Sequence, residues 1–295
     1  MPPLSYIVIA FIVPAVVVAV AAFLRWRWIF ALAFPAAFAV AQWEIHGLPP
    51  GAPGSGDAGF WIFWFTIPLA VLGLLDAVFR PSLALRAAIG FVGAVIAFHL
   101  LLSNLSVAAP KAVWIQRSWV WGLAAAATVL WAGLESLAER NAGVTVPAIL
   151  AVQCLGGAAL LGTENSVVAS HGAVALAAMA CAAVAVSLVR RNITYSRGPV
   201  LTLSFSLVAL LACAYFYAYP DLPGTSVAYG AVLIFSPLLA WCGEIRGIRR
   251  RGPLLRFFVR ILPVLLVVGT VAAVAVHEYV AGQTNGAGPG GGEEE

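Results

Sequence analysis

Charged residues are scarce in this chain. Its 295 residues include 16 Lys and Arg and 12 Asp and Glu, which together make up 9% of the sequence. A soluble domain has about a quarter of its residues charged, because its surface has to face water. Apolar residues account for 62% of this chain. The composition therefore excludes an ordinary soluble globule and predicts a protein whose surroundings are largely hydrocarbon.

The sequence also lacks the short motifs of common enzymes. It contains no phosphate-binding loop, no GxSxG and no HExxH, the patterns that position phosphate, a nucleophilic serine or a catalytic zinc. No two of its four cysteines have the spacing of metal ligands, and each lies in or at the end of an apolar run. Neither a disulfide framework nor a zinc site is indicated.

Ten apolar runs are long enough to cross a membrane, which takes about 20 residues per helix. No stretch shows the alternation of a membrane barrel strand. The predicted fold class is all-α, a polytopic integral membrane bundle of about ten transmembrane helices. The runs cover approximately residues 4–24, 28–46, 60–79, 84–106, 117–138, 144–163, 167–189, 198–219, 226–244 and 257–280.

Basic residues are distributed unevenly over the loops between these runs. Counting alternate loops, 14 Lys and Arg residues lie on one side and only Lys111 and Arg117 on the other. Basic loops face the cytoplasm, so we expect a plasma (inner) membrane protein with both termini outside. The partner is the lipid bilayer, and no basic patch favours nucleic acid. Arg246–Arg260 carries six arginines and would attract anionic lipid, although orientation signalling alone also explains it.

The predicted domain organisation is a single bundle over residues 1–281, followed by a Gly-rich acidic tail over residues 282–295. The tail has the composition of a disordered segment. The chain reads FTIPLA around Pro68 and FSPLLA around Pro237. Extending this match pairs helices 1–4 with helices 7–10 as a parallel repeat, an arrangement found in transporters. The alternative is that Pro, Leu and Ala are simply common in membrane helices.

Four carboxylates lie near the basic ends of their helices, within reach of loop arginines. We expect Asp76, Glu135, Glu139 and Glu244 to pair with Arg80, Arg140 and Arg246 at the membrane interface. No carboxylate lies at mid-membrane, which weakens the case for a proton- or sodium-coupled carrier.

Histidines and further carboxylates collect on the opposite, outer side. Histidine with carboxylate can bind a metal or act as an acid-base pair, and facing histidines can ligate haem. One hypothesis is therefore a membrane enzyme or redox subunit with a site on the outer face. The alternative is that these residues are unconnected and solvated. The candidates are His46, His99, His171, His277, Glu44, Glu164 and Glu278.

A chain without soluble domains favours a permease-like or channel-like protein that moves a small neutral or weakly polar solute. Prolines that interrupt helices and polar side chains at mid-membrane are typical of transport cavities. A third hypothesis is a scaffold subunit of a larger membrane complex. The candidates for a transport cavity are Pro68, Pro237, Gln153, Thr202 and Ser206.

Overall fold

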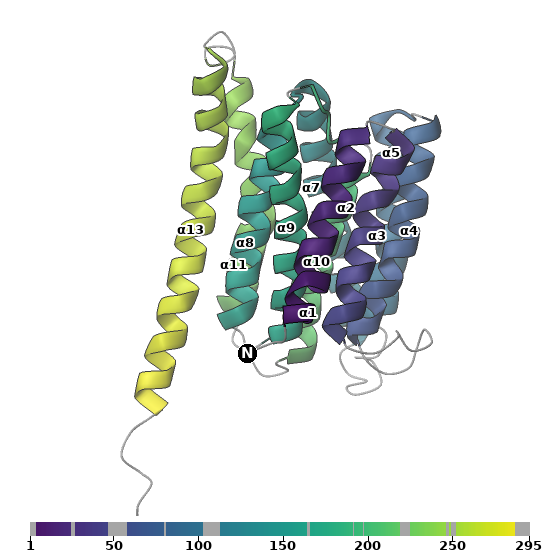
Figure 1. Ribbon diagram of the computed structural model, residues 1–295. Coiled ribbons are helices and arrows are strands. Elements are labelled where there is room, and N and C mark those ends of the chain that lie inside the picture. Colours follow the sequence, from purple (N-terminus) through teal and green to yellow (C-terminus); the bar gives the residue numbers. More distant parts are fainter. Residues whose placement is uncertain are drawn as a thin grey trace, which may run out of the picture.

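The computed structural model of the chain is a bundle of long helices (Figure 1). It describes residues 4–24, 27–46, 58–79, 81–102, 113–163, 166–190, 192–196, 198–218, 225–245, 248 and 252–286. Over these ranges the regular elements are all helical. Ten helices are long and apolar enough to cross a membrane, which confirms the predicted helical class and helix number.

Each of the ten spans corresponds to one predicted run. The first combines α1 (Leu4–Ile7), η1 (Val8–Ile12) and α2 (Val13–Leu24), and α3 (Arg27–His46), α4 (Ala58–Phe79) and α5 (Leu83–Leu102) follow. The middle spans are α7 (Val113–Arg140), α8 (Thr145–Thr163) and α9 (Val167–Val189). The eighth is α10 (Pro199–Cys213) with η3 (Ala214–Ala218), the ninth is α11 (Thr225–Phe235) with η4 (Ser236–Glu244), and the tenth is α13 (Pro253–Gly286).

Helix α13 runs past the predicted end of the bundle at residue 281 and continues to Gly286. The rest of the predicted tail, residues 287–295, lies outside the described residues, as do the loops at 47–57 and 103–112. The parallel repeat of helices 1–4 and 7–10 stays a prediction.

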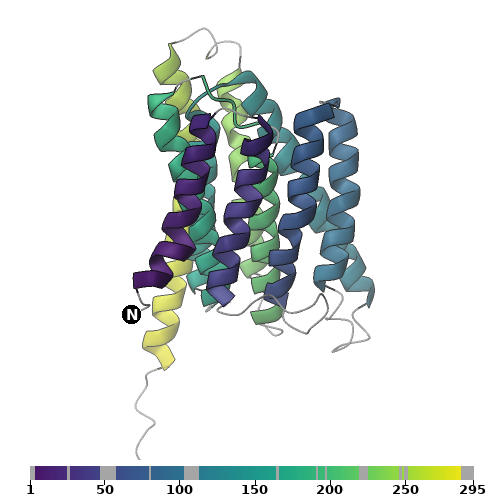
Figure 2. The ribbon, with the colours of Figure 1, turned by 45° about the vertical axis from the view of Figure 1, so that its right-hand side comes forward.

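Successive spans run in opposite directions, so the bundle has two distinct ends. We call the end that carries Arg86, Arg140, Arg190 and Arg260 the basic end, which is uppermost in Figure 1. The opposite end lies near the start of α1. Helices α4 and α5 form one flank of the bundle and α13 the other, as both views show (Figure 2).

Helix α10 lies at the centre of the bundle, and every residue from Pro199 to Cys213 is buried. It packs against α3, α4, α7, α8 and α9. A helix that is largely apolar on every face is suited to such a position, because no face requires water. The polar side chains that α10 carries are therefore surrounded by protein.

Glycines allow the helices around α8 to approach closely. A Cβ atom added at Gly156 would lie 2.1 Å from Cγ1 of Val268 on α13, and one added at Gly157 would lie 2.8 Å from Cδ1 of Leu207 on α10. Small residues at such contacts bring backbones together in membrane bundles. The glycines and alanines of α8 and α9 thus serve packing inside the bundle.

The connection between α9 and α10 is fixed by one tyrosine and one glycine. The hydroxyl of Tyr195 donates to the carbonyl of Ala183 (2.6 Å) and accepts from Ser187 (2.9 Å). Burial raises the pKa of this phenol, and the hydrogen bond from Ser187 opposes the shift. Gly198 has φ +120°, and a Cβ there would lie 2.8 Å from Cα of Ala31. Only glycine fits this start of α10.

Candidate functional site

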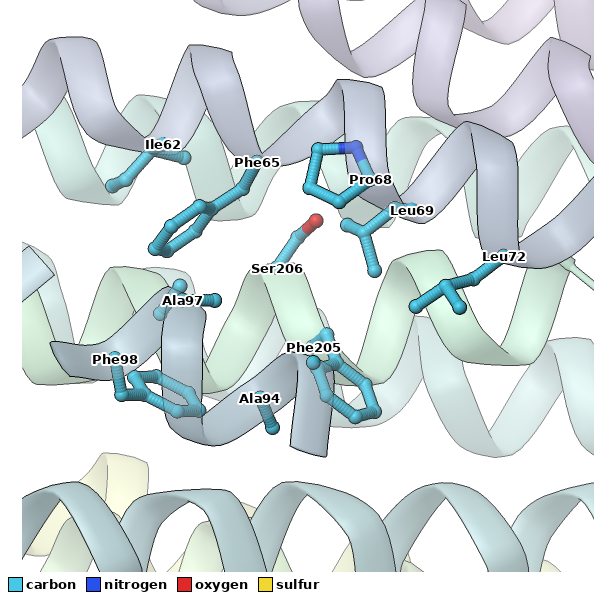
Figure 3. A pocket seen from close by; sticks show the side chains of 12 residues that line it. Ile62, Phe65, Pro68, Leu69, Leu72, Ala94, Ala97, Phe98, Phe205 and Ser206 are labelled. Atoms are coloured by element: carbon cyan, nitrogen blue, oxygen red, sulfur yellow. The ribbon is translucent and has the colours of Figure 1, made fainter. Parts of the chain in front are cut away.

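An apolar cavity of about 40 Å³ lies between α4, α5 and α10 (Figure 3). We call it the middle cavity. Pro68, Gly93 and Ser206 contribute one wall residue from each of these helices. The Ser206 side chain points toward Pro68 and Leu69 in Figure 3. Its hydroxyl is buried and has no hydrogen-bond partner among the described residues, and the other side chains that line the cavity are apolar.

A second cavity, of about 230 Å³, continues from the first toward the basic end. We call it the basic-end cavity. Leu72 of α4 lines both cavities. Asp76, Arg86 and Trp131 are among the residues that line the second. The two cavities therefore follow one another along the seam between α4 and α5.

Two aromatic rings stand at the junction of the cavities. Phe205 lines the middle cavity and Trp131 lines the basic-end cavity, and their ring centroids are 6.0 Å apart at an interplanar angle of 73°. Gly90 leaves room for the indole, because a Cβ there would lie only 2.5 Å from Cζ3 of Trp131. Leu72, Phe205 and Trp131 thus lie where the linings of the two cavities meet.

A cluster of ionic side chains adjoins the basic-end cavity. Arg86 Nη1 lies 3.3 Å from Asp76 Oδ2 and 2.9 Å from Glu135 Oε1, and Arg86 Nη2 lies 2.7 Å from Glu139 Oε1. Arg86, Asp76 and Glu135 are 5%, 6% and 0% exposed, while the Glu139 side chain is 35% exposed. Three helices, α4, α5 and α7, are thus joined through one guanidinium.

The sequence did not predict the part that Arg86 plays in this pairing. Arg86, which the sequence places among the loop arginines, is a buried residue of α5 and holds three of the four carboxylates. Arg140 instead stacks over the ring of Trp241, 5.0 Å from its centroid. Arg80 and Arg246 lie outside the described residues. The sequence could not identify Arg86 as the partner of these carboxylates, because they lie on other helices.

The fourth carboxylate, Glu244, belongs to a separate cluster. It binds Arg260 and accepts a hydrogen bond from Asn141 Nδ2 at 3.2 Å. Arg260 is 4% exposed. A Cβ at Gly243 would lie 2.4 Å from Arg260 Cγ, so the glycine makes space for this side chain. Arg260 therefore cannot contribute its charge to a lipid surface.

Gln153 and Pro237, two of the predicted cavity residues, meet at a break in a helix. The α-helix α11 gives way to the 3₁₀ turns of η4 at Ser236. Pro237 has no N–H, so the carbonyls of Leu233 and Ile234 lose the donor that an α-helix or a 3₁₀-helix would supply. Gln153 Nε2 donates to both, at 3.3 and 3.2 Å. This amide repairs the break.

The other predicted cavity residues have two different positions. Pro68 and Ser206 line the middle cavity. Thr202 instead donates to the carbonyl of Gly198, 3.1 Å away on its own helix. Gln153, Thr202 and Pro237 line neither of the two cavities.

A third, apolar space of about 370 Å³ lies on the other side of α10, between α7 and α11. We call it the lateral groove. Trp119, Tyr215 and Phe216 form an aromatic group on its wall, with ring centroids 4.9 to 5.6 Å apart. Gly122 and Gly230 also line it, and a Cβ at either would meet nothing within 4 Å. These glycines leave the groove open.

The candidate metal ligands are spread over the opposite end. His99 and His277 lie on exposed faces of α5 and α13. His171 Nδ1 forms a 2.6 Å hydrogen bond with the Tyr6 hydroxyl, and the Phe11 ring packs edge-on against the imidazole.

The carboxylates proposed as their co-ligands complete this end of the bundle. Glu278 accepts from the Tyr229 hydroxyl at 2.9 Å. Glu44 and His46 are half-buried at the end of α3, and Glu164 lies outside the described residues. Over the described ranges no group of three or more His, Cys, Asp or Glu is placed to hold a metal ion. The outer-face metal or haem site thus stays a prediction.

Comparisons of the chain with protein-family models, with curated proteins and with solved structures found no match. Its ten long apolar helices are those of a multi-pass membrane protein.

Proposed function

We propose that this multi-pass protein transports a small neutral or weakly polar solute along the seam between α4 and α5. The observation that supports this most directly is the succession of two cavities that share Leu72. Polar groups occur at two points along them, Ser206 in the middle cavity and the Arg86 cluster at the basic end. A route with widely spaced polar contacts suits a solute with few hydrogen-bonding groups.

The wall of the middle cavity disfavours a charged solute. An ion that enters apolar surroundings loses its hydration, and one hydroxyl group cannot replace it. Ser206 can exchange one hydrogen bond with a passing solute. The seam is therefore suited to a molecule that already tolerates a hydrocarbon environment.

In this proposal the structure corresponds to a closed state of the seam. The middle cavity, at about 40 Å³, is far smaller than the roughly 300–1,000 Å³ of ordinary ligand pockets. Passage of a solute requires α4 and α5 to separate. Pro68 favours such a movement, because it removes one backbone hydrogen bond within α4 and allows the helix to bend. Alternating access fits this arrangement better than a permanently open channel.

Filling the middle cavity tests the route. A Cβ at Gly93 would lie 3.5 Å from Cδ1 of Leu72, an ordinary contact, so Gly93→Leu fills the seam without a backbone clash. Gly122→Leu is the matched control, because it adds the same side chain to the lateral groove. Both variants are reconstituted in liposomes, and uptake of glycerol and of urea is followed by osmotic swelling.

Transport along the seam predicts that Gly93→Leu abolishes the protein-dependent swelling and that Gly122→Leu retains it. Blockage by Gly122→Leu alone would move the route to the lateral groove. If the wild-type protein leaves swelling at the rate of empty liposomes for both solutes, transport of small neutral solutes is refuted.

We further propose that the basic end faces the cytoplasm of the plasma membrane, on the basis of the uneven distribution of arginines. Anionic lipid would then contact Arg246–Arg260 through its arginines other than Arg260, whose charge is bound by Glu244. A tag after residue 295 should be cleaved by protease added outside intact cells. Alanines at Arg249, Arg250 and Arg251 should lower the anionic lipid retained by the purified protein.

A further inference from the structure

The lateral groove is the largest of the three spaces, and most of its wall is apolar. Its volume of about 370 Å³ lies within the roughly 300–1,000 Å³ of ordinary ligand pockets. Among the described residues that line it, Trp119 and Tyr215 alone carry polar side-chain atoms. A bound water molecule needs about two to four polar partners, so water is disfavoured over most of this wall. Val129 and Phe235 line the groove and are 52% and 41% exposed, so it opens on a flank that faces hydrocarbon.

The aromatic residues place the mouth of the groove at the membrane boundary. Trp119 and Tyr215 lie within two residues of the ends of their spans, which are Arg117 and Phe216. Tryptophan and tyrosine prefer the head-group layer of a bilayer. Helix α7 reaches the basic end at its other terminus, Arg140, so this mouth lies at the end opposite the basic end. The groove therefore begins at the head groups of that leaflet.

The groove closes near the middle of the membrane. On α7 its lining residues run from Trp119 to Val129, a stretch of about 15 Å at about 1.5 Å per residue. This is half of the ~30 Å of the hydrocarbon core. One turn beyond Val129, a Cβ at Gly133 would lie 2.5 Å from Cδ2 of Leu238, and Trp241 Nε1 donates to the carbonyl of Gly133 at 3.2 Å. Beyond the groove, α7 is thus packed against η4.

The depth of the groove favours a lipid chain over a helix of a second copy. A partner helix would have to cross the whole membrane, and the contact between α7 and η4 closes its path in the other leaflet. The described residues that line the groove number 16, fewer than the roughly 20–30 that each partner contributes to a standard protein interface. A hydrocarbon chain needs only one leaflet of depth and no polar contacts. Left empty, the groove would forfeit dispersion contacts along its walls.

We propose that the lateral groove binds one hydrocarbon chain of a phospholipid from the leaflet at the end opposite the basic end. The head group stays at the level of Trp119 and Tyr215, and the chain runs between α7 and α11 toward Val129. Gly122 and Gly230 leave the space for it, because a Cβ at either would meet nothing within 4 Å. The site does not depend on the proposed function, which places transport on the other side of α10.

Photolabelling of the purified protein in nanodiscs tests whether a chain enters the groove. The probes are two phosphatidylcholines, one with a diazirine near the carboxyl end of a chain and one with a diazirine at the chain terminus. Leu211, Ala212 and Ile234 are the reporters, because they line the groove but are only 9%, 3% and 7% exposed. The exposed Leu265 and Leu266 of α13 are the control for labelling of the surface. Tandem mass spectrometry locates the labelled residues.

In the wild type, the carboxyl-end probe is expected to label Leu211 and Ala212 near the mouth, and the terminal probe to label Ile234 at the closed end. The reverse order of depth would bring the chain from the other leaflet and overturns the proposal. So does labelling of Leu265 and Leu266 without any labelling of the reporters, whatever the variants do. If the unlabelled protein is then a dimer in the nanodisc, the groove belongs to a second copy.

Three leucine variants complete the test. Gly122→Leu and Gly230→Leu fill the groove from either wall and should abolish the labelling of the reporters. Gly269→Leu is the matched control, because Gly269 is an exposed glycine of α13 where a Cβ would also meet nothing within 4 Å, and it should retain that labelling. Equal labelling of the reporters in all three variants overturns the proposal. Labelling as expected without solute uptake in liposomes would retain the site and refute transport.

Discussion

Replacing Gln153 with leucine should destabilise the bundle, because the break at Pro237 depends on its amide. The substitution removes the donor from two backbone carbonyls, those of Leu233 and Ile234. Leu233 O retains the Ser236 hydroxyl at 2.9 Å, so the main loss falls on Ile234 O. A buried acceptor without a donor costs about 1–3 kcal/mol.

Two opposing effects reduce that figure. Hydrogen bonds between membrane helices contribute about 0.6 kcal/mol on average. The Gln153 side-chain oxygen has no partner among the described residues, so its removal recovers part of the loss. We therefore expect Gln153→Leu to lower the free energy of unfolding by about 1 kcal/mol. Pro237→Ala restores an N–H to the helix and should reduce the cost of Gln153→Leu by at least half, which a double-mutant cycle measures.

The assay is equilibrium unfolding in mixed micelles with a rising fraction of sodium dodecyl sulfate, followed by circular dichroism. Gln42→Leu is the matched control. Gln42 is also a buried helical glutamine and is 1% exposed, but neither its nitrogen nor its oxygen has a partner among the described residues. Its replacement should be neutral or stabilising. The reasoning is refuted if the two variants are equally stable, or if Gln153→Leu costs the same with and without Pro237.

Three further predictions concern single positions. Gly90→Ala would place a Cβ 2.5 Å from the Trp131 ring and should cost about 1–3 kcal/mol in the same unfolding assay; wild-type stability would show that the indole moves freely. Arg86→Met leaves the surrounding carboxylates without their guanidinium and should cost about 3–5 kcal/mol, and a loss below about 1 kcal/mol would show that the cluster is hydrated. Burial raises the pKa of Tyr195, so its phenol stabilises the fold at neutral pH and that contribution should fall as pH rises above about 10. Tyr195→Phe should abolish this alkaline loss, and an unchanged pH profile in the variant would assign it to other groups.

Membrane-spanning helices were predictable because each one satisfies its own backbone. A run such as 167–189 needs only length and apolar side chains to be recognised, and α9 covers the same residues. The middle of α10 is equally apolar, but its central position depends on how its neighbours pack. Pro68 and Ser206 were predicted as cavity residues, and the structure brings both to one cavity.

Partners across helices were not predictable in the same way. The expected pairing of carboxylates relied on neighbours in sequence, whereas Arg86 and Glu135 are 49 residues apart. The sequence marks Gln153 as a candidate cavity residue. Its hydrogen bonds could not be predicted, because they depend on α8 lying beside the break at Pro237, 84 positions further along the chain. The basic-end cavity was not predicted, because Trp131 looks like any interior aromatic residue in the sequence.

The sequence by itself determined the class of the protein, the ten helices and their alternating directions. Those properties follow from composition and from hydrogen bonds made within each helix. Only the tertiary structure decided which helices enclose a cavity, which arginine holds the carboxylates and which buried donors lack an acceptor. Lateral packing of apolar helices leaves little trace in hydropathy, since a side chain against lipid and a side chain against protein can be equally apolar.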